Sequence, residues 1–201
     1  MASAKDELRN ELRRVRDTLT HDRVERAAAS AARHLMGLSD LPRTHSHLTF
    51  DRVSIVALYA AIGSEIDTSP IATRLIERDI TLAYPRVTED SLRLTFHRVQ
   101  RPEELLRGTF GIPEPAATTP IVPLASIEVV LVPGLGFDAR GYRLGWGKGY
   151  YDFTLAESSH ALRIGLAFEC QVVPEVPHEW NDMPVDIIVT EDGIRRCSVH
   201  G

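Results

Sequence analysis

The opening of the chain repeats apolar residues at the spacing of an α-helix. They predict a helix over residues 5–19 that carries one apolar stripe. The stripe consists of Leu8, Leu12, Val15 and Leu19. Thr20, a residue type that favours helix starts, then opens a second helix containing the alanine-rich run 27–32. We therefore predict an N-terminal pair of helices, followed by a polar loop over residues 38–51.

Beyond this loop the pattern changes to short apolar runs rich in Val, Ile and Leu, which are typical of buried strands. The predicted strands cover residues 53–59, 80–84, 92–97, 127–132, 163–167 and 185–190, with a proline-rich connection over 99–124 and a helix over 150–157. Another helix is predicted between the first two strands, with Ser69 as its cap and Pro70 at its first position. Ile71, Leu75 and Ile76 are predicted to form its inner side.

Strands that alternate with helices favour a parallel or mixed sheet covered on both faces. We therefore predict an α/β fold in a single domain over residues 1–201, a three-layer Rossmann-like sandwich with a mostly parallel central sheet. Ligands of such folds bind at the carboxyl ends of the strands. The most apolar strand, 127–132, is followed by a glycine-rich stretch, so the sequence places a site there.

Composition narrows the classes of function. A net charge of -5 argues against a general nucleic-acid-binding surface. No apolar run approaches the roughly 18–20 residues that span a membrane, and the charged opening does not resemble a secretory signal. The two cysteines, Cys170 and Cys197, are far apart and read as reduced thiols. These features predict a cytoplasmic protein whose partners are small molecules, neither nucleic acid nor membrane.

The stretch "VPGLGFDARGYRLGWGKGYYD", residues 132–152, has the composition of a phosphate site. Its glycines are Gly134, Gly136, Gly141, Gly145, Gly147 and Gly149. Glycines allow successive backbone N–H groups to line a concavity that binds anions, and Arg143 and Lys148 add positive charge. The stretch is not a Walker A loop, because Gly149 follows Lys148 where that motif has Ser or Thr. The alternative is a tight turn with two incidental cations.

Acidic and aromatic residues beside the stretch each have two interpretations. Asp152, in the first turn of the predicted helix, either favours the helix dipole or holds Mg²⁺ together with phosphate oxygens. Asp182 has the same two interpretations, and Asp186 lies near enough in sequence to compete with it. Tyr150 and Tyr151 are adjacent, so in a helix we expect one in the core and the other facing the site.

At this stretch the sequence resembles the 5-formyltetrahydrofolate cyclo-ligase family, also called methenyltetrahydrofolate synthetases. "PGLGFDARGYRLGWGKGYYD" is similar to the family signature, "KDELRNELRRVR" to its basic first helix and "SEIDT" to its glutamate-containing loop. "FGIPEP" and "NDMPVD" stand where related segments stand, so the resemblance runs from Lys5 to about Glu191. Trp146 and Lys148 occupy positions where members vary, and Phe153 replaces a frequent basic residue.

The resemblance implies conversion of 5-formyltetrahydrofolate to 5,10-methenyltetrahydrofolate, with ATP as co-substrate, Mg²⁺ as metal, and ADP and phosphate as products. In this reaction nitrogen-10 must attack the formyl carbon on nitrogen-5, and the formyl oxygen must leave. Phosphorylation by ATP turns that oxygen into a good leaving group, and the transfer depends mainly on positioning and charge neutralisation. The expected protein is a monomer that binds folate and ATP.

The resemblance also implies individual roles. The ATP-binding residues would be Lys5, Arg9, Arg143, Leu144, Gly145, Trp146, Gly147, Lys148, Gly149, Tyr150 and Tyr151. The folate-binding residues would be Glu65, Trp146, Gly147, Lys148, Gly149 and Tyr150, and the metal ligands Asp152 and Asp182. Lys148 and Arg143 would be catalytic, with Lys148 nearest the reacting phosphate. Glu65 would accept two hydrogen bonds from the pterin amino-pyrimidinone edge, and the Trp146 indole could stack on the pterin.

Three other basic residues are not assigned to ATP binding or catalysis. Arg13 and Arg16 continue the basic row of the first helix, and we expect both on the surface. Arg86 follows a predicted strand end, where it either meets the glutamate tail of the folate or has no role in binding.

Two other classes of function are compatible with a glycine-rich loop on a parallel sheet. A non-catalytic nucleotide-binding module would need neither Glu65 nor the paired carboxylates. A sugar-phosphate isomerase or acyltransferase of related architecture would need a catalytic carboxylate and no ATP. ATP turnover that requires a formylated folate separates the first interpretation from both alternatives.

Overall fold

The computed structural model describes residues 3–38, 52–88 and 91–198. The described part begins with helices α1, Ala4–Asp17, and α2, His21–Met36. Ser3 and Asp6 form a capping box at the start of α1, and the Thr20 side chain caps α2 as predicted. The predicted N-terminal helical pair is therefore confirmed. The predicted polar loop lies, apart from Leu38, outside the described residues.

An eight-stranded sheet forms the centre of the molecule. Its strands are β1 Ile55–Ala57, β2 Thr81–Val87, β3 Leu94–Val99, β6 Ile121–Val122, β7 Val129–Val132, β10 Leu162–Leu166, β11 Ile187–Val189 and β12 Ile194–Arg196. Their spatial order is β12-β11-β10-β7-β1-β2-β3-β6. The strands from β11 to β2 pair in parallel, whereas β12, β3 and β6 pair antiparallel at the edges. This is the mostly parallel α/β sheet that the sequence predicts.

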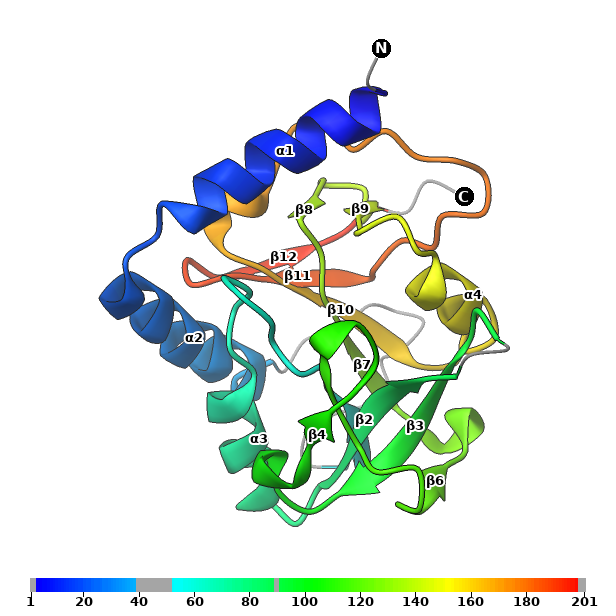
Figure 1. Ribbon diagram of the computed structural model, residues 1–201. Helices are drawn as coiled ribbons and strands as arrows, with labels where there is room; N and C mark the ends of the chain where they lie inside the picture. The colour runs from blue at the N-terminus through cyan, green and yellow to red at the C-terminus, as the bar shows by residue number, and fades with distance from the viewer. Residues whose placement is uncertain (1–2, 39–51, 89–90, 199–201) are drawn as a thin grey trace.

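Helices cover both faces of the sheet. α2 and α3 (Ser69–Ile76) lie on one side and α4 (Tyr150–Ala156) on the other (Figure 1). Successive residues of β7 alternate between the two cores: Val129 and Leu131 pack with α2 and α3, whereas Val130 and Val132 pack on the α4 side. Burial on both faces explains why the strand reads as a continuous apolar run. None of the described helices is long and apolar enough to cross a membrane.

The remaining elements of the described chain are short. They are η2 Pro102–Glu104, β4 Leu106–Arg107, η3 Thr109–Gly111, β5 Pro113–Glu114, η4 Leu124–Ser126, β8 Gly136–Phe137, β9 Arg143–Leu144 and η5 Glu169–Gln171. β8 and β9 pair into a hairpin beneath α1, where Leu12 and Leu144 are buried in a small apolar cluster (Figure 1). This packing places the glycine-rich stretch next to α1.

Several predicted details of the helices are wrong. The N-cap of α3 is Thr68, without a side-chain capping bond, and Ser69 is already the first helical residue. Ile76 is exposed, because it lies one residue past Leu75 and is rotated off the buried side of this short helix. Val15 is exposed too, because the last turn of α1 buries Arg16 instead.

Strand ends differ from the prediction by up to three residues. The largest difference is at β2, which continues through Pro85 to Val87. β1 pairs with β2 only up to Ala83, so Pro85 pairs with β3 alone and its missing N–H is tolerated beyond the end of the β1 ladder. The edge strand β12 was not predicted; its sequence lacks the apolar run that marks the buried strands.

Candidate active site

A cavity of about 620 Å³ opens at the carboxyl ends of β1 and β7. These strands are neighbours in the sheet, but the chain leaves β1 toward β2 and returns on the other side to form β7. Such a reversal separates the loops that follow the two strands and leaves a crevice between them. Tyr59, which follows β1, and Pro133, which follows β7, both line the cavity. The site is therefore where the fold class predicts it.

All the residues proposed for the site from the sequence line this cavity. They are Lys5, Arg9, Glu65, Arg143, Leu144, Gly145, Trp146, Gly147, Lys148, Gly149, Tyr150, Tyr151, Asp152 and Asp182. They come from α1, the loop after β1, the segment from β9 into α4, and the loop before β11. The fold thus brings together residues from four separate parts of the chain.

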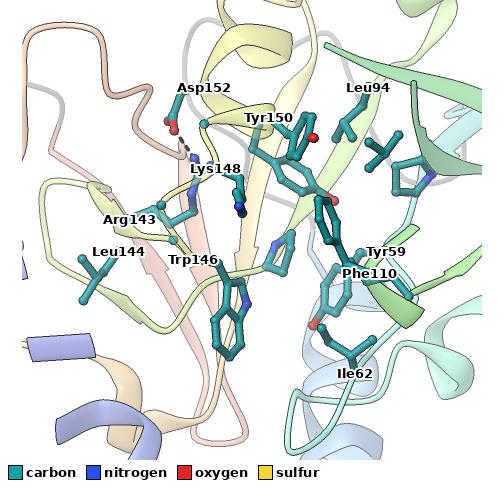
Figure 2. Close-up of a pocket in the computed structure, with 18 of the residues that line it drawn as sticks. Tyr59, Ile62, Leu94, Phe110, Arg143, Leu144, Trp146, Lys148, Tyr150 and Asp152 are labelled. Carbon is teal, nitrogen blue, oxygen red and sulfur yellow. Dashed lines mark hydrogen bonds and ion pairs between the residues drawn. The ribbon is translucent and has the colours of Figure 1, made fainter. Parts of the chain in front are cut away.

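Arg143 marks the charged end of the cavity. Its side chain is only 5% exposed, and its Nη2 lies 2.6 Å from Oδ1 of Asp152 (Figure 2). Oδ1 of Asp152 also accepts a hydrogen bond from the backbone N–H of Met183. Nη1 of Arg143 is buried and has no hydrogen-bond partner among the described residues. An unsatisfied buried donor on a cation is costly unless an anion pairs with it, so this atom is suited to a phosphate oxygen.

Two basic residues of α1 reach the same end. Nζ of Lys5 lies 3.0 Å from Oδ2 of Asp182 and 3.1 Å from Oε1 of Glu179. Partial burial lowers the pKa of Lys5, but the two carboxylates outweigh it and the pKa is raised. Nε of Arg9 donates a 2.9 Å hydrogen bond to the carbonyl oxygen of Gly145. α1 is thereby attached both to the segment 143–151, which we call the glycine loop, and to the loop before β11.

The glycine loop has a backbone that few other residues could adopt. Gly147 and Gly149 have φ angles of +88° and +77°, in the left-handed region that glycine enters without steric cost. The loop presents Lys148, whose Nζ lies 5.4 Å from the centre of the Phe110 ring. Figure 2 shows Lys148 and Trp146 facing Phe110 across the cavity. The long Lys148 side chain thus places a cation between the charged end of the cavity and its aromatic residues.

The aromatic end contains one buried carboxylate. Glu65 is 8% exposed; its Oε2 accepts a hydrogen bond from the Ile62 N–H, and its Oε1 accepts one of 3.3 Å from the Trp146 indole N–H. Burial raises the pKa of Glu65, while these two donors and the Arg16 charge oppose the increase. A carboxylate in this position is a strong acceptor for a planar ligand that presents N–H groups.

Tyrosines complete the aromatic end. Tyr59 donates a hydrogen bond to the Ile66 carbonyl oxygen, so its ring is fixed at the wall. Tyr150 and Tyr151 both line the cavity, and both also pack against the core on the α4 side. The expectation that one would face the core and the other the site is therefore wrong. Burial raises the pKa of Tyr151, so its hydroxyl stays protonated near neutral pH.

Sequence reasoning missed Arg16, which was expected on the surface and is 3% exposed. Its guanidinium lies 5.8 Å from the Trp146 ring centre, and that of Arg13, which is exposed as expected, lies 4.8 Å from it. Arg9, Arg13 and Arg16 repeat at helical intervals, but this spacing does not distinguish a buried arginine from an exposed one.

The "FGIPEP" segment also supplies residues that were not proposed for the site. Phe110, whose own φ is +58°, projects into the cavity, and Glu114, which is 2% exposed, lines the cavity wall. Arg86 lies near Glu114, with its Nη1 3.6 Å from Oε2, and donates a hydrogen bond to the Pro115 carbonyl oxygen. Arg86 does not line the cavity, so its contacts hold this segment in place.

The acidic residues fit a magnesium ion that is also bound by phosphate. Asp152 and Asp182 each pair with a cation through one carboxylate oxygen, and within the described residues the other oxygen accepts no hydrogen bond. Asp186 instead accepts a hydrogen bond from the Arg163 N–H outside the cavity lining. The described ranges contain no group of three or more His, Cys, Asp or Glu that could hold a metal alone. Mg²⁺ commonly uses one or two carboxylates and completes its shell with phosphate and water.

Comparison with known proteins agrees with this arrangement. The family model described as the 5-formyltetrahydrofolate cyclo-ligase family matches residues 1–191. The 5-formyltetrahydrofolate cyclo-ligase of Haemophilus influenzae is 28% identical over 190 residues, covering 92% of this chain and 97% of that protein. The NMR structure of Aquifex aeolicus 5,10-methenyltetrahydrofolate synthetase matches with a TM-score of 0.80 and 32% identity, covering 99% of this chain and 94% of that one. From sequence and fold together, this chain belongs to the 5-formyltetrahydrofolate cyclo-ligase family.

Proposed function

We propose that this chain catalyses the ATP-dependent conversion of 5-formyltetrahydrofolate to 5,10-methenyltetrahydrofolate, with release of ADP and phosphate. Membership of a family whose named members are cyclo-ligases supports the reaction. The observation that carries the proposal within the site is the division of one cavity into two ends. Cations gather around Arg143 at one end, and aromatic rings surround the Glu65 carboxylate at the other.

The folate pterin would occupy the aromatic end. Glu65 would accept two N–H groups from the amino-pyrimidinone edge, and its burial strengthens such hydrogen bonds. The indole N–H of Trp146 now occupies Oε1 of Glu65, so the pterin would take over this hydrogen bond. The rings of Phe110 and Tyr150 offer flat surfaces on which the pterin could stack.

ATP would occupy the charged end. Lys5 and Arg9 on α1 would contact the nucleotide, as would the glycine loop from Arg143 to Tyr151. Nη1 of Arg143 would donate to a phosphate oxygen, and Lys148 would follow the transferring phosphoryl group on its long side chain. Cations fixed around that group stabilise its transition state more than its ground state, which is the main contribution a protein makes to such transfers.

The chemistry joins the two ends. The formyl oxygen takes the terminal phosphoryl group of ATP, and ADP leaves. Nitrogen-10 then attacks the activated formyl carbon and loses its proton, the carbon–oxygen bond breaks, and the oxygen departs as part of inorganic phosphate. The protein's role is to hold the formyl oxygen against the phosphoryl group and to exclude water.

Mg²⁺ would be held by Asp152 and Asp182, and it would neutralise phosphate charge when bound. Arg143 and Lys5 already hold these carboxylates in place, through Oδ1 of Asp152 and Oδ2 of Asp182. The remaining oxygens of both aspartates are the ones we assign to the metal. Asp186 is left out of this assignment because its carboxylate contacts the backbone of Arg163.

We also propose that the enzyme acts as a monomer in the cytoplasm. The residues assigned to folate, ATP and Mg²⁺ converge on one cavity of this chain, which supports a site within a single subunit. Cys170 and Cys197 are both free thiols, which suits a reducing compartment. Light scattering during size-exclusion chromatography of the active protein is expected to give the mass of one chain; a dimeric active species would contradict the proposal.

The direct test of the reaction follows the absorbance of 5,10-methenyltetrahydrofolate. Purified protein is mixed with 5-formyltetrahydrofolate and Mg²⁺, with or without ATP. We expect product only with ATP, and ADP formed in equal amount. ATP binding without folate affinity would favour a nucleotide-binding module, and turnover without ATP would favour an isomerase or acyltransferase.

A further inference from the structure

Arg16 is a buried cation that the mechanism above does not use. It lies in the last turn of α1 and is 3% exposed. Its Nε donates a 3.0 Å hydrogen bond to Oγ of Ser64, the residue immediately before Glu65. Ser64 in turn donates a 2.5 Å hydrogen bond to Asp17, so the loop after β1 is bound to the end of α1. A single guanidinium thus anchors the segment that carries the proposed pterin acceptor.

The other side of the guanidinium faces the cavity wall. It lies 5.8 Å from the centre of the Trp146 ring, whose N–H donates to Glu65. Nη1 of Arg16 is buried and has no hydrogen-bond partner among the described residues. Burial lowers the pKa of Arg16, and the negative charges of Glu65 and Asp17 oppose this change through space.

We propose that Arg16 is a positioning residue: through Ser64 and the Trp146 ring it holds Glu65 and Trp146 in the arrangement that receives the pterin, and its positive charge favours the Glu65 carboxylate. This proposal rests on the proposed function, because Arg16 would affect folate binding by way of the role assigned to Glu65. Arg16 touches neither substrate nor the reacting atoms, so its removal acts on folate binding and leaves phosphoryl transfer almost unchanged.

Other groups facing Glu65 do not supply the same charge. Tyr59 and Tyr151 interact with it electrostatically, and burial raises the pKa of both, so both are neutral near pH 7. The Ile62 N–H and the Trp146 indole donate hydrogen bonds but carry no charge. Among the described residues Arg16 is the cation whose charge favours the ionised form of Glu65.

The test compares Arg16→Met with Arg16→Lys and with a control, Arg14→Met. Arg14 lies on the same helix, is exposed, and donates a hydrogen bond to the Asn10 carbonyl oxygen. KM for 5-formyltetrahydrofolate is measured by ADP release between about pH 5 and pH 9 at saturating ATP, and thermal unfolding of each variant is recorded. Methionine removes an incompletely paired buried donor, so we expect it to leave folding intact.

We expect Arg16→Met to move the acidic limb of the KM profile to higher pH, because the Arg16 charge opposes the increase in the Glu65 pKa that burial causes. For each pH unit by which the limb moves, KM below it rises about tenfold. The values of kcat and of KM for ATP should stay within about twofold, whereas kcat would fall if Arg16 acted on phosphoryl transfer. Arg16→Lys should restore most of the wild-type profile, and Arg14→Met should match the wild type.

Variants made in a Glu65→Gln background distinguish failure of the role proposed for Arg16 from failure of the role proposed for Glu65. If Arg16 acts through Glu65, adding Arg16→Met to Glu65→Gln changes KM for the folate by less than about twofold. The same increase in both backgrounds, or an unshifted profile in Arg16→Met, would overturn the role of Arg16 while leaving the proposed function intact. An unchanged folate KM in Glu65→Gln alone would show instead that the proposed role of Glu65 has failed, and the role of Arg16 with it.

Discussion

The two ends of the cavity hold their charged groups in different ways. At the charged end Arg143 and Lys5 each contact a carboxylate directly, at 2.6 Å and 3.0 Å, and Asp152 and Asp182 each keep one oxygen that accepts no hydrogen bond from residues 3–38, 52–88 or 91–198. At the aromatic end Glu65 is buried, and the donors that contact it directly from the same ranges are neutral. Its positive counterpart, Arg16, acts from a distance, behind the wall.

This difference fits two kinds of ligand. Ion pairs at the charged end can exchange partners when a polyphosphate and a metal arrive, because each charged group keeps unused donors or acceptors. A buried carboxylate surrounded by aromatic rings is suited to a flat, neutral group that presents N–H donors. We therefore expect the charged end to determine the rate of phosphoryl transfer and the aromatic end to determine which substrate is held against it.

The largest effect is expected at the charged end, from Lys148→Ala. Loss of this cation should lower kcat by about 10²–10³-fold, the range seen when one group stabilising a transition state is removed. The fall in kcat should exceed any rise in KM for the folate, which Lys148 would also contact. Lys148 is exposed, so the unfolding transition should be unaffected. Steady-state ADP release checks both parameters, and Arg101→Ala, an exposed cation outside the cavity lining, serves as the control.

A smaller, complementary effect is expected at the aromatic end, from Glu65→Gln. KM for 5-formyltetrahydrofolate should rise about 10–100-fold, because hydrogen bonds to a charged group contribute about 1.5–3 kcal/mol. KM for ATP should stay as in the wild type. If instead KM for ATP rose and KM for the folate did not, the assignment of the two ends would be reversed.

The same variant should change the dependence of stability on pH. Burial raises the pKa of Glu65 in the folded protein above its ordinary value, so the folded state binds this proton more tightly. The contribution of Glu65 to stability is therefore present below the ordinary pKa and is lost as pH rises through the raised one. Glu65→Gln removes this loss. The free energy of unfolding, measured with urea below the ordinary pKa and above the raised pKa, should therefore depend less on pH in the variant than in the wild type.

A moderate effect is expected on the metal. Asp152→Asn and Asp182→Asn should each raise the Mg²⁺ concentration for half-maximal activity by at least about tenfold. Chelation of Mg²⁺ with EDTA should abolish turnover of the wild type. Asp186→Asn keeps an acceptor for the Arg163 N–H and should leave the Mg²⁺ titration unchanged; an effect there equal to that of Asp182→Asn would reopen the choice between the two aspartates.

The smallest effect concerns the loop between the two ends. Gly147→Ala places a side chain at φ of +88° and 3.3 Å from Nη2 of Arg9, so the unfolding free energy should fall by about 1–2 kcal/mol. Gly145→Ala is the matched control, because Gly145 lacks a positive φ and its added Cβ would meet Nε of Arg143 at 3.7 Å. Equal losses in chemical denaturation of the two variants would contradict the conformational explanation.

Much of the charged end could be predicted from the sequence, because its central residues lie close together along the chain. Arg143, Lys148 and Asp152 belong to one short stretch between a strand and a helix. The glycines within it limit the backbone, and the strand before it indicates which edge of the sheet it occupies. Lys5 came from the resemblance of the first helix and not from any local pattern.

The aromatic end depends on contacts that no local pattern contains. Arg16 looks like any exposed cation of an amphipathic helix, and only the packing of α1 against the Ser64 loop buries it. Phe110 and Glu114 lie in a proline-rich connection whose path is set by irregular turns and by Arg86. Edge strand β12 was missed for a similar reason, since an exposed antiparallel strand needs no apolar run.

The central claim is that the formyl oxygen is phosphorylated by ATP where the two ends of the cavity meet. The most direct measurement uses 5-formyltetrahydrofolate labelled with ¹⁸O in the formyl group and analyses the inorganic phosphate by mass spectrometry after turnover. The account predicts one ¹⁸O atom in each phosphate released. Unlabelled phosphate, with the ¹⁸O recovered in water, would contradict it, because the oxygen would then have left the folate without ever bonding to the phosphoryl group.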